Sequence, residues 1–208
     1  MAACWYTRPR CLASSMTTND STEEKFLGPT PADVPLDYLP TRELTDEQFE
    51  RAKDIARARS RSYEQIEGGQ ICGDQTNFDA HLTGTVGEVA FAVETGSHVD
   101  DTVYQDGDDG YDFRFGALTI DTKTTATHVE RPSLLVPVEP TPTANLYFFL
   151  HRIDTRTVRF IGFATRFGVT DRTPVREPGD ILNYVIPQNE LWLPPGIEAV
   201  LADDSLVR

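Results

Sequence analysis

The chain has 208 residues, of which 39% are hydrophobic and 25% are charged. At about 100–200 residues per domain, this length allows one domain, or one domain with tails. No apolar run approaches the roughly 20 residues that a membrane-spanning helix needs. Three cysteines are too few for a disulfide scaffold. Composition therefore excludes a membrane protein and a disulfide-stabilised miniprotein.

The net charge is −14, from 33 acidic and 19 basic residues. Aspartate outnumbers glutamate, and arginine far outnumbers lysine. This composition resembles that of cytoplasmic proteins from extreme halophiles and the viruses that infect them; an ordinary acidic protein is the alternative. In a halophile the acidic charge does not argue against nucleic-acid binding, as it otherwise would, because the whole proteome is acidic. We expect a cytoplasmic protein of a halophilic archaeon, or one in the host cytoplasm if it is viral.

The N-terminal region differs from the rest of the chain. Residues 1–15 carry two arginines and no acid, and we interpret them as an upstream start or an expression remnant. They lack the apolar stretch of a signal peptide. Residues 17–44 are polar and contain four prolines. We therefore expect a disordered or extended arm over 1–40 and one domain over 41–208.

Two helices are expected next. Thr45 and Gln48 have the spacing of a capping box, and apolar residues then recur at a helical period until Gly68-Gly69. A second helix is expected to begin near Thr85 and to end at Gly96, because glycine commonly follows the last helical residue.

The following part of the chain is rich in β-forming residues. Strands are expected over 98–104, 111–115, 118–124, 146–153 and 157–164. Asp154–Thr157 has the composition of a hairpin turn between the last two. The prolines in 126–144 permit no assignment there, and the C-terminal part is expected to form short strands and turns.

The candidate functional residues flank Gly116-Ala117. If these two residues form a hairpin loop, Phe113 lies opposite Ile120 and Asp112 lies opposite Asp121. Lys123 shares the face of Asp121, because side chains alternate along a strand.

Two carboxylates directly opposite each other destabilise a sheet, and a divalent cation between them removes that cost. Mg²⁺ prefers oxygen ligands, often one or two carboxylates with water and phosphate. A lysine beside such an ion can hold the attacking water or stabilise the charge that develops on a phosphoryl group.

These residues resemble the motif of the PD-(D/E)xK nuclease superfamily, which has the restriction-endonuclease-like fold. Asp112 matches the first acid, and Asp121–Lys123 matches the D-x-K element. Gly84–Ala90 resembles the G-x-x-G-E-x-A helix of many members. The resemblance implies an α/β fold with a mixed central sheet flanked by helices. Two features depart from it: the two acids are close in sequence, and no crossover helix is visible after Lys123.

The resemblance also implies a Mg²⁺- or Mn²⁺-dependent nuclease that hydrolyses phosphodiester bonds in DNA. The expected catalytic residues are Lys123, Asp121, Asp112 and Glu88. The expected metal site consists of Asp112, Asp121, Glu88 and Thr122. The expected nucleic-acid contacts are Thr124, Thr125 and Arg114. The expected partners are DNA, a second copy of the chain in a homodimer, and viral or host DNA-processing proteins, with no membrane.

Other interpretations stay open at the level of sequence. The same fold could serve as a non-catalytic DNA-binding, virion or interaction module, and an unrelated β-rich binding protein is a third reading. Glu88 could complete a capping box with Thr85. The two aspartates could be solvated surface acids, and the threonines after Lys123 ordinary strand residues. Arginines of the first helix could meet phosphate or pair with nearby acids.

Overall fold

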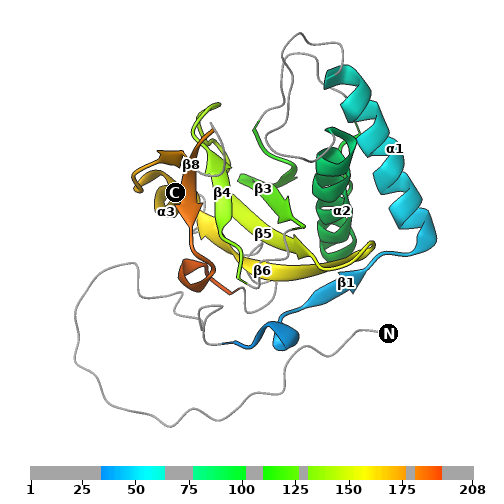
Figure 1. The fold of residues 1–208 in the computed structure, drawn as a ribbon, viewed down its shortest axis with the longest axis horizontal. Coiled ribbons are helices and arrows are strands. Elements are labelled where there is room, and N and C mark those ends of the chain that lie inside the picture. The colour runs from blue at the N-terminus through cyan, green and yellow to red at the C-terminus, as the bar shows by residue number, and fades with distance from the viewer. Residues whose placement is uncertain (1–33, 64–76, 102–109, 127–130, 177–180, 194–208) are drawn as a thin grey trace.

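The computed structural model describes residues 34–63, 77–101, 110–126, 131–176 and 181–193 (Figure 1). Within these ranges the protein is a mixed α/β structure. Its α-helices are α1 (Asp46–Tyr63), α2 (Asn77–Thr95) and α3 (Arg166–Thr170). Its strands are β1 (Thr41–Glu43), β2 (Phe113–Phe115), β3 (Leu118–Thr125), β4 (Leu134–Pro137), β5 (Leu146–Arg152), β6 (Thr157–Thr165), β7 (Val175–Arg176) and β8 (Leu182–Ile186). Short 3₁₀ helices span Leu36–Tyr38 and Gln188–Glu190.

The strands form two sheets. The larger has the order β1-β6-β5-β3-β2, and the smaller has the order β4-β8-β7. In the larger sheet β3 and β5 are parallel, whereas the other neighbouring pairs are antiparallel. Helix α2 lies against the large sheet with α1 beside it, and β4 and β8 lie beyond the sheet from α2 (Figure 1). The expected mixed sheet is therefore present, with helices on one face and a small sheet with α3 on the other.

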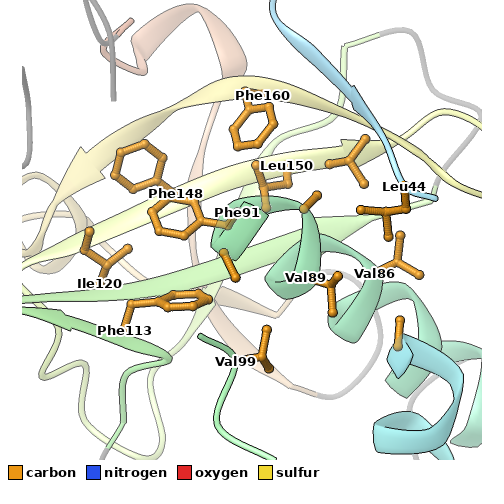
Figure 2. Close-up of a cluster of buried hydrophobic side chains, with 14 of the residues drawn as sticks. Leu44, Val86, Val89, Phe91, Val99, Phe113, Ile120, Phe148, Leu150 and Phe160 are labelled. Atoms are coloured by element: carbon orange, nitrogen blue, oxygen red, sulfur yellow. The ribbon is translucent and has the colours of Figure 1, made fainter. Parts of the chain in front are cut away.

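The core between α2 and the large sheet is aromatic. Phe91 of α2 packs against Phe113 and Phe148, with ring centroids 4.8 and 5.1 Å apart (Figure 2). Such tilted and edge-on pairs add to the stabilisation from burying apolar area. Small residues of α1, Ala52 and Ala56, are fully buried and let the two helices approach closely. This core fixes α2 against the strands that carry the candidate site.

A second core fills the other face of the large sheet. Tyr147, Phe149 and Ile161 point into it, together with residues of β4, β8 and α3. Leu39 is also in this core, with 4% of its surface exposed. The predicted boundary of the arm at residue 40 is therefore wrong for residues 34–40. They join the domain because an apolar pocket accepts Leu39 and because the Phe160 N–H donates to the Pro40 carbonyl at 2.8 Å. Residues 1–33 lie outside the described ranges.

The predicted start of α1 is confirmed. The Thr45 N–H donates to Gln48 Oε1 at 2.9 Å, and the Gln48 N–H donates to Thr45 Oγ1 at 3.2 Å. These reciprocal bonds are the capping box that the spacing predicts. The predicted stop at Gly68-Gly69 lies outside the described residues.

The predicted start of α2 is wrong, and its predicted end is confirmed. The helix begins at Asn77, well before Thr85. The Thr85 hydroxyl donates to the His81 carbonyl at 2.7 Å, so it is satisfied inside the helix and does not cap it. Gly96 has a φ of +67°, and the Ser97 N–H donates to the Ala92 carbonyl at 3.0 Å, which is the glycine-terminated end that the sequence predicts.

Most of the predicted strands are present. β3, β5 and β6 fall where they were expected, and Asp154 Oδ1 accepts from two N–H groups of the predicted turn, at 2.8 Å each. The predicted strand 98–104 is absent over its described part, 98–101. The proline-rich segment 126–144 contains β4, which lies in the connection between the parallel strands β3 and β5. The described part of that connection contains this strand and no helix.

In the described ranges, no helix combines the length and the apolar character that crossing a bilayer requires.

Candidate active site

The predicted register of the β2–β3 hairpin is confirmed. Phe113 is paired with Ile120, Phe115 is paired with Leu118, and Gly116 in the loop has a φ of +61°. Phe113 and Ile120 are buried toward α2. Alternation along β3 then places Asp121 on the opposite face of the sheet.

Asp112 lies just before β2, and its side chain does not simply face Asp121 as the register alone predicts. Its Oδ2 accepts hydrogen bonds from the Thr122 N–H at 2.7 Å and from Thr122 Oγ1 at 2.5 Å. The Asp112 N–H donates to the Ile120 carbonyl at 2.8 Å. Because β2 begins only at Phe113, Thr122 has no strand partner on that side, and the carboxylate of Asp112 supplies one.

Asp121 and Lys123 share a face of β3, as predicted. Lys123 Nζ lies 2.7 Å from Asp121 Oδ2. Asp121 is 9% exposed, whereas about a third of the Lys123 side chain, 34%, is open to solvent. The ammonium therefore neutralises a nearly buried carboxylate and can still reach a ligand.

Glu88 projects from α2 and is held by an arginine of α1. Arg59 donates through Nη1 to Glu88 Oε1 at 2.6 Å and through Nη2 to Oε2 at 2.9 Å. Arg59 Nη2 also lies 3.3 Å from the Asp100 carbonyl. This two-point geometry is the strong form of an arginine–carboxylate pair, and it ties the two helices together.

Gly87 explains how α2 brings Glu88 so near β3. A Cβ added at Gly87 would lie 1.8 Å from Thr124 Oγ1, so any other residue would collide with the strand. Thr124 Oγ1 is buried and has no hydrogen-bond partner in the part of the chain that the structure describes. The second glycine of the G-x-x-G-E-x-A segment is therefore a point of helix–strand contact.

The charges of these groups act on one another. Burial first, and then the charge of Asp112, raise the pKa of Glu88 to about 7, against the opposing effects of Arg59 and then Lys123. Asp112 is half-buried as a residue, but its carboxylate lies among protein atoms, and this burial raises its pKa. The bonds from Thr122 oppose that rise, followed by the charges of Lys123 and Arg59.

The expected cause of electrostatic destabilisation at the site therefore needs correction. Sequence reasoning assigns it to repulsion between Asp112 and Asp121. In the structure its first cause is burial, and the neighbouring carboxylate that raises the pKa of Glu88 is Asp112. Asp121 is instead neutralised by Lys123.

The predicted metal-ligand set is not gathered as one cluster of side chains. Among the described residues, no three or more His, Cys, Asp or Glu side chains form a group that could hold a metal ion. Mg²⁺ needs fewer, since it commonly takes one or two carboxylates and keeps several waters. The Thr122 carbonyl lies on the same side of β3 as its N–H, which bonds Asp112. Asp112, Asp121 and this carbonyl offer oxygen atoms, the ligand type that Mg²⁺ and Mn²⁺ prefer, while Glu88 is engaged by Arg59.

The predicted nucleic-acid contacts have different surroundings. Arg114 is exposed and stacks on the Tyr111 ring, with its guanidinium carbon 4.8 Å from the ring centre. Thr125 is half-buried at the end of β3. The hydroxyl of Thr124 is buried against Gly87 and is not open to a phosphate, so we do not retain Thr124 as a contact.

The role of Arg59 was missed by sequence reasoning, which offered phosphate or nearby acids of the same helix as its partners. Its partner Glu88 belongs to another helix, and no local spacing signals such a pair. The alternative that Glu88 completes a capping box with Thr85 is wrong, because Thr85 lies inside α2.

Comparisons with protein-family models, with curated proteins and with solved structures found no match, so what this site does has to be argued from its own residues.

Proposed function

We propose that the protein is a Mg²⁺- or Mn²⁺-dependent nuclease that hydrolyses phosphodiester bonds in DNA. The observation that carries this proposal is the arrangement around Thr122. The Asp112 carboxylate accepts from the Thr122 N–H. Asp121 precedes Thr122 in β3, and the partly exposed Lys123 follows it. Acidic oxygens next to one accessible ammonium suit a phosphoryl-transfer site, where catalysis depends on positioning and charge stabilisation.

Each residue has a role in this proposal. Asp112, Asp121 and the Thr122 carbonyl hold the ion. When bound, the ion supplies Lewis acidity toward a phosphoryl oxygen and lowers the pKa of water. Lys123 orients the attacking water and stabilises the negative charge that develops on the phosphorus oxygens, because its ammonium is both fixed by Asp121 and open to solvent.

Glu88 and Arg59 act as positioning residues. Their two-point ion pair holds α2 to α1 and keeps a buried carboxylate next to Asp112. The charge of Glu88 also favours a cation at Asp112. Arg59 offsets part of that negative charge when no cation is bound.

The composition bears on the conditions in which this activity should be sought. We propose a halophilic source on the basis of the net charge of −14 and the low share of lysine. At about 1 M salt the Debye length falls to roughly 3 Å, so repulsion between the surface acids is weak. The assays below are therefore made in molar KCl.

A second candidate function is a non-catalytic DNA-binding, virion or interaction module. One observation favours it: each carboxylate of the site already has a partner within the protein. Asp112 is bonded by Thr122, Asp121 by Lys123 and Glu88 by Arg59. A polar network of this kind can be stable without a cation.

Cleavage with and without metal separates the two candidates. Wild type should cut duplex, single-stranded or branched DNA in molar KCl with Mg²⁺ or Mn²⁺, and should not cut in EDTA. Asp121→Asn should lose cleavage by about 10²-fold or more, since a well-placed charged group is removed. Asp54→Asn is the matched control, because Asp54 is an exposed acid of α1 paired with Arg57. Wild type that cuts no substrate with either metal would make the non-catalytic module the better account.

A further inference from the structure

Two exposed arginines lie at the edge of the candidate site, on the face of the large sheet away from α2. Arg114 is the middle residue of β2 and is exposed, whereas Phe113 and Phe115 on either side pack against the α2 core. Its Cα partner is Thr119, two residues before Asp121 and on the same face of β3. Arg166 is the first residue of α3, directly after β6, and is also exposed.

The two arginines are attached to one framework. Asn145 Oδ1 accepts from the Thr119 N–H and from Thr119 Oγ1, at 2.8 Å each. The Arg166 N–H donates to the Asn145 carbonyl at 2.9 Å. Asn145 therefore links the strand partner of Arg114 to the backbone of Arg166.

Thr143 extends this framework toward Asp112. Arg166 Nη1 lies 3.4 Å from the Thr143 carbonyl, and Thr143 Oγ1 lies 3.4 Å from the carbonyl of Gly110. Gly110 has a φ of +77° and stands two residues before Asp112. The loop that positions the first aspartate is thus in contact with the residue that holds the Arg166 side chain.

Both guanidinium groups are held by neutral partners. Arg114 donates to the Tyr111 hydroxyl through Nη2 at 2.7 Å and stacks on the same ring. Arg166 donates through Nη1 to the Thr143 carbonyl. Across the described ranges neither forms an ion pair with an acid, whereas Arg42, Arg59 and Arg172 each do. Their positive charges are therefore not cancelled by a direct partner, in a chain that carries −14.

Arg166 and the second aspartate both act on one buried side chain, that of Tyr147. Tyr147 is the Cα partner of Asp121 across β3 and β5 and points into the core on that face. Burial and then the charge of Asp121 raise the pKa of Tyr147, while the Ala144 backbone and then the charge of Arg166 lower it. The Tyr147 hydroxyl is therefore within electrostatic reach of both groups, and the two arginines and Asp121 belong to one neighbourhood.

We propose that Arg114 and Arg166 form a clamp for the phosphodiester backbone of DNA beside the catalytic residues. This inference rests on the proposed function and names the surface by which the substrate is held. A guanidinium presents several N–H donors in a planar fork that fits phosphate oxygens, and it stays charged at all working pH values. On an otherwise acidic surface, a positive spot fixes where a polyanion can approach.

The test measures binding without cleavage. A short labelled duplex is titrated in EDTA with wild type, Arg114→Gln, Arg166→Gln and the double variant, over a KCl series. Each single variant should bind about tenfold more weakly, because a charge-assisted hydrogen bond to phosphate is lost. In the double variant the slope of log affinity against log salt should fall by about 1.8, which is about 0.9 for each phosphate contact.

Arg57→Gln is the control for loss of charge alone, since Arg57 is exposed on α1 and paired with Asp54. It should bind like wild type, and all variants should bind Mn²⁺ with wild-type affinity. If the Arg114 and Arg166 variants bind DNA like wild type while wild type cleaves it, the clamp is overturned and the nuclease stands. If they bind weakly and wild type cleaves nothing, the clamp stands and the nuclease fails. Wild type that binds no DNA overturns both.

Discussion

At the scale of single residues, Glu88 shows how burial opposes the charge of a carboxylate. Glu88 is 6% exposed, and the pair with Arg59 and the charge of Lys123 stabilise its ionised form. Burying a charge is costly unless it is well paired. Glu88 was predicted from the resemblance of Gly84–Ala90 to the G-x-x-G-E-x-A helix, but its partner was not, because the pair joins two helices whose packing is set by the core.

The pH dependence of stability should report on Glu88. Its pKa rises from an ordinary value of 4.5 to about 7 on folding, so the folded protein holds this proton more tightly than the unfolded chain does. The free energy of unfolding should therefore be highest at and below pH 4.5, as far as this group contributes, and fall as pH rises through 7.

The measurement is urea unfolding of wild type and Glu88→Gln in EDTA at constant KCl, across that pH range. The stability of wild type relative to the variant should decrease as pH rises, because only wild type must ionise the buried group. A difference that does not change with pH would contradict the raised pKa.

At the scale of elements, the contact between α2 and β3 positions the site, and two glycines of the same helix test it. A Cβ at Gly87 would meet Thr124 Oγ1 at 1.8 Å, whereas a Cβ at Gly84 would meet nothing within 4 Å. Gly87→Ala should lower the free energy of unfolding by about 1–3 kcal/mol, the usual cost of overpacking. Gly84→Ala should raise it by up to about 1 kcal/mol, because alanine favours a helix more than glycine does.

The companion variant Thr124→Ala removes the colliding oxygen. In the Gly87→Ala background it should restore part of the lost stability, measured by denaturant unfolding of the four proteins in a double-mutant cycle. Equal stability of Gly87→Ala and Gly84→Ala would show that α2 does not lie so close to β3.

The elements also show what local patterns can and cannot predict. The register of the β2–β3 hairpin and the capping box of α1 depend on neighbouring residues, and both were predictable. The start of α2 was not predictable, because the threonines and glycines within 83–87 look like a helix boundary. Burial against the sheet keeps the chain helical there. The direction of the Asp112 carboxylate depends on where β2 begins, which alternation alone does not reveal.

At the scale of the whole molecule, the N-terminal segment belongs to the fold from residue 34 onward. Leu39 is 4% exposed in the core on the second face of the large sheet, and its neighbour Tyr38 is 76% exposed. Leu39→Ala should lower the free energy of unfolding by about 2–5 kcal/mol, through lost burial and a residual cavity. Tyr38→Ala should change it by less than about 0.5 kcal/mol.

Thermal and denaturant unfolding in molar KCl measure both variants. The sequence predicts a disordered or extended arm over 1–40, because prolines and polar residues dominate it. Because Leu39 is buried in the core, that expectation does not hold for residues 34–40. Equal stability of the two variants would show that the segment does not dock on the core.

We propose that Lys123 acts on the phosphoryl group at a metal site built by Asp112, Asp121 and Thr122. The most direct measurement compares Lys123→Arg with wild type for DNA cleavage and for Mn²⁺ binding in molar KCl. An arginine keeps the positive charge beside Asp121 but not the compact ammonium or its ability to release a proton. We expect unchanged folding and Mn²⁺ affinity, with cleavage reduced by about 10²-fold or more. A Lys123→Arg protein that cuts DNA as fast as wild type would contradict the assigned role of Lys123.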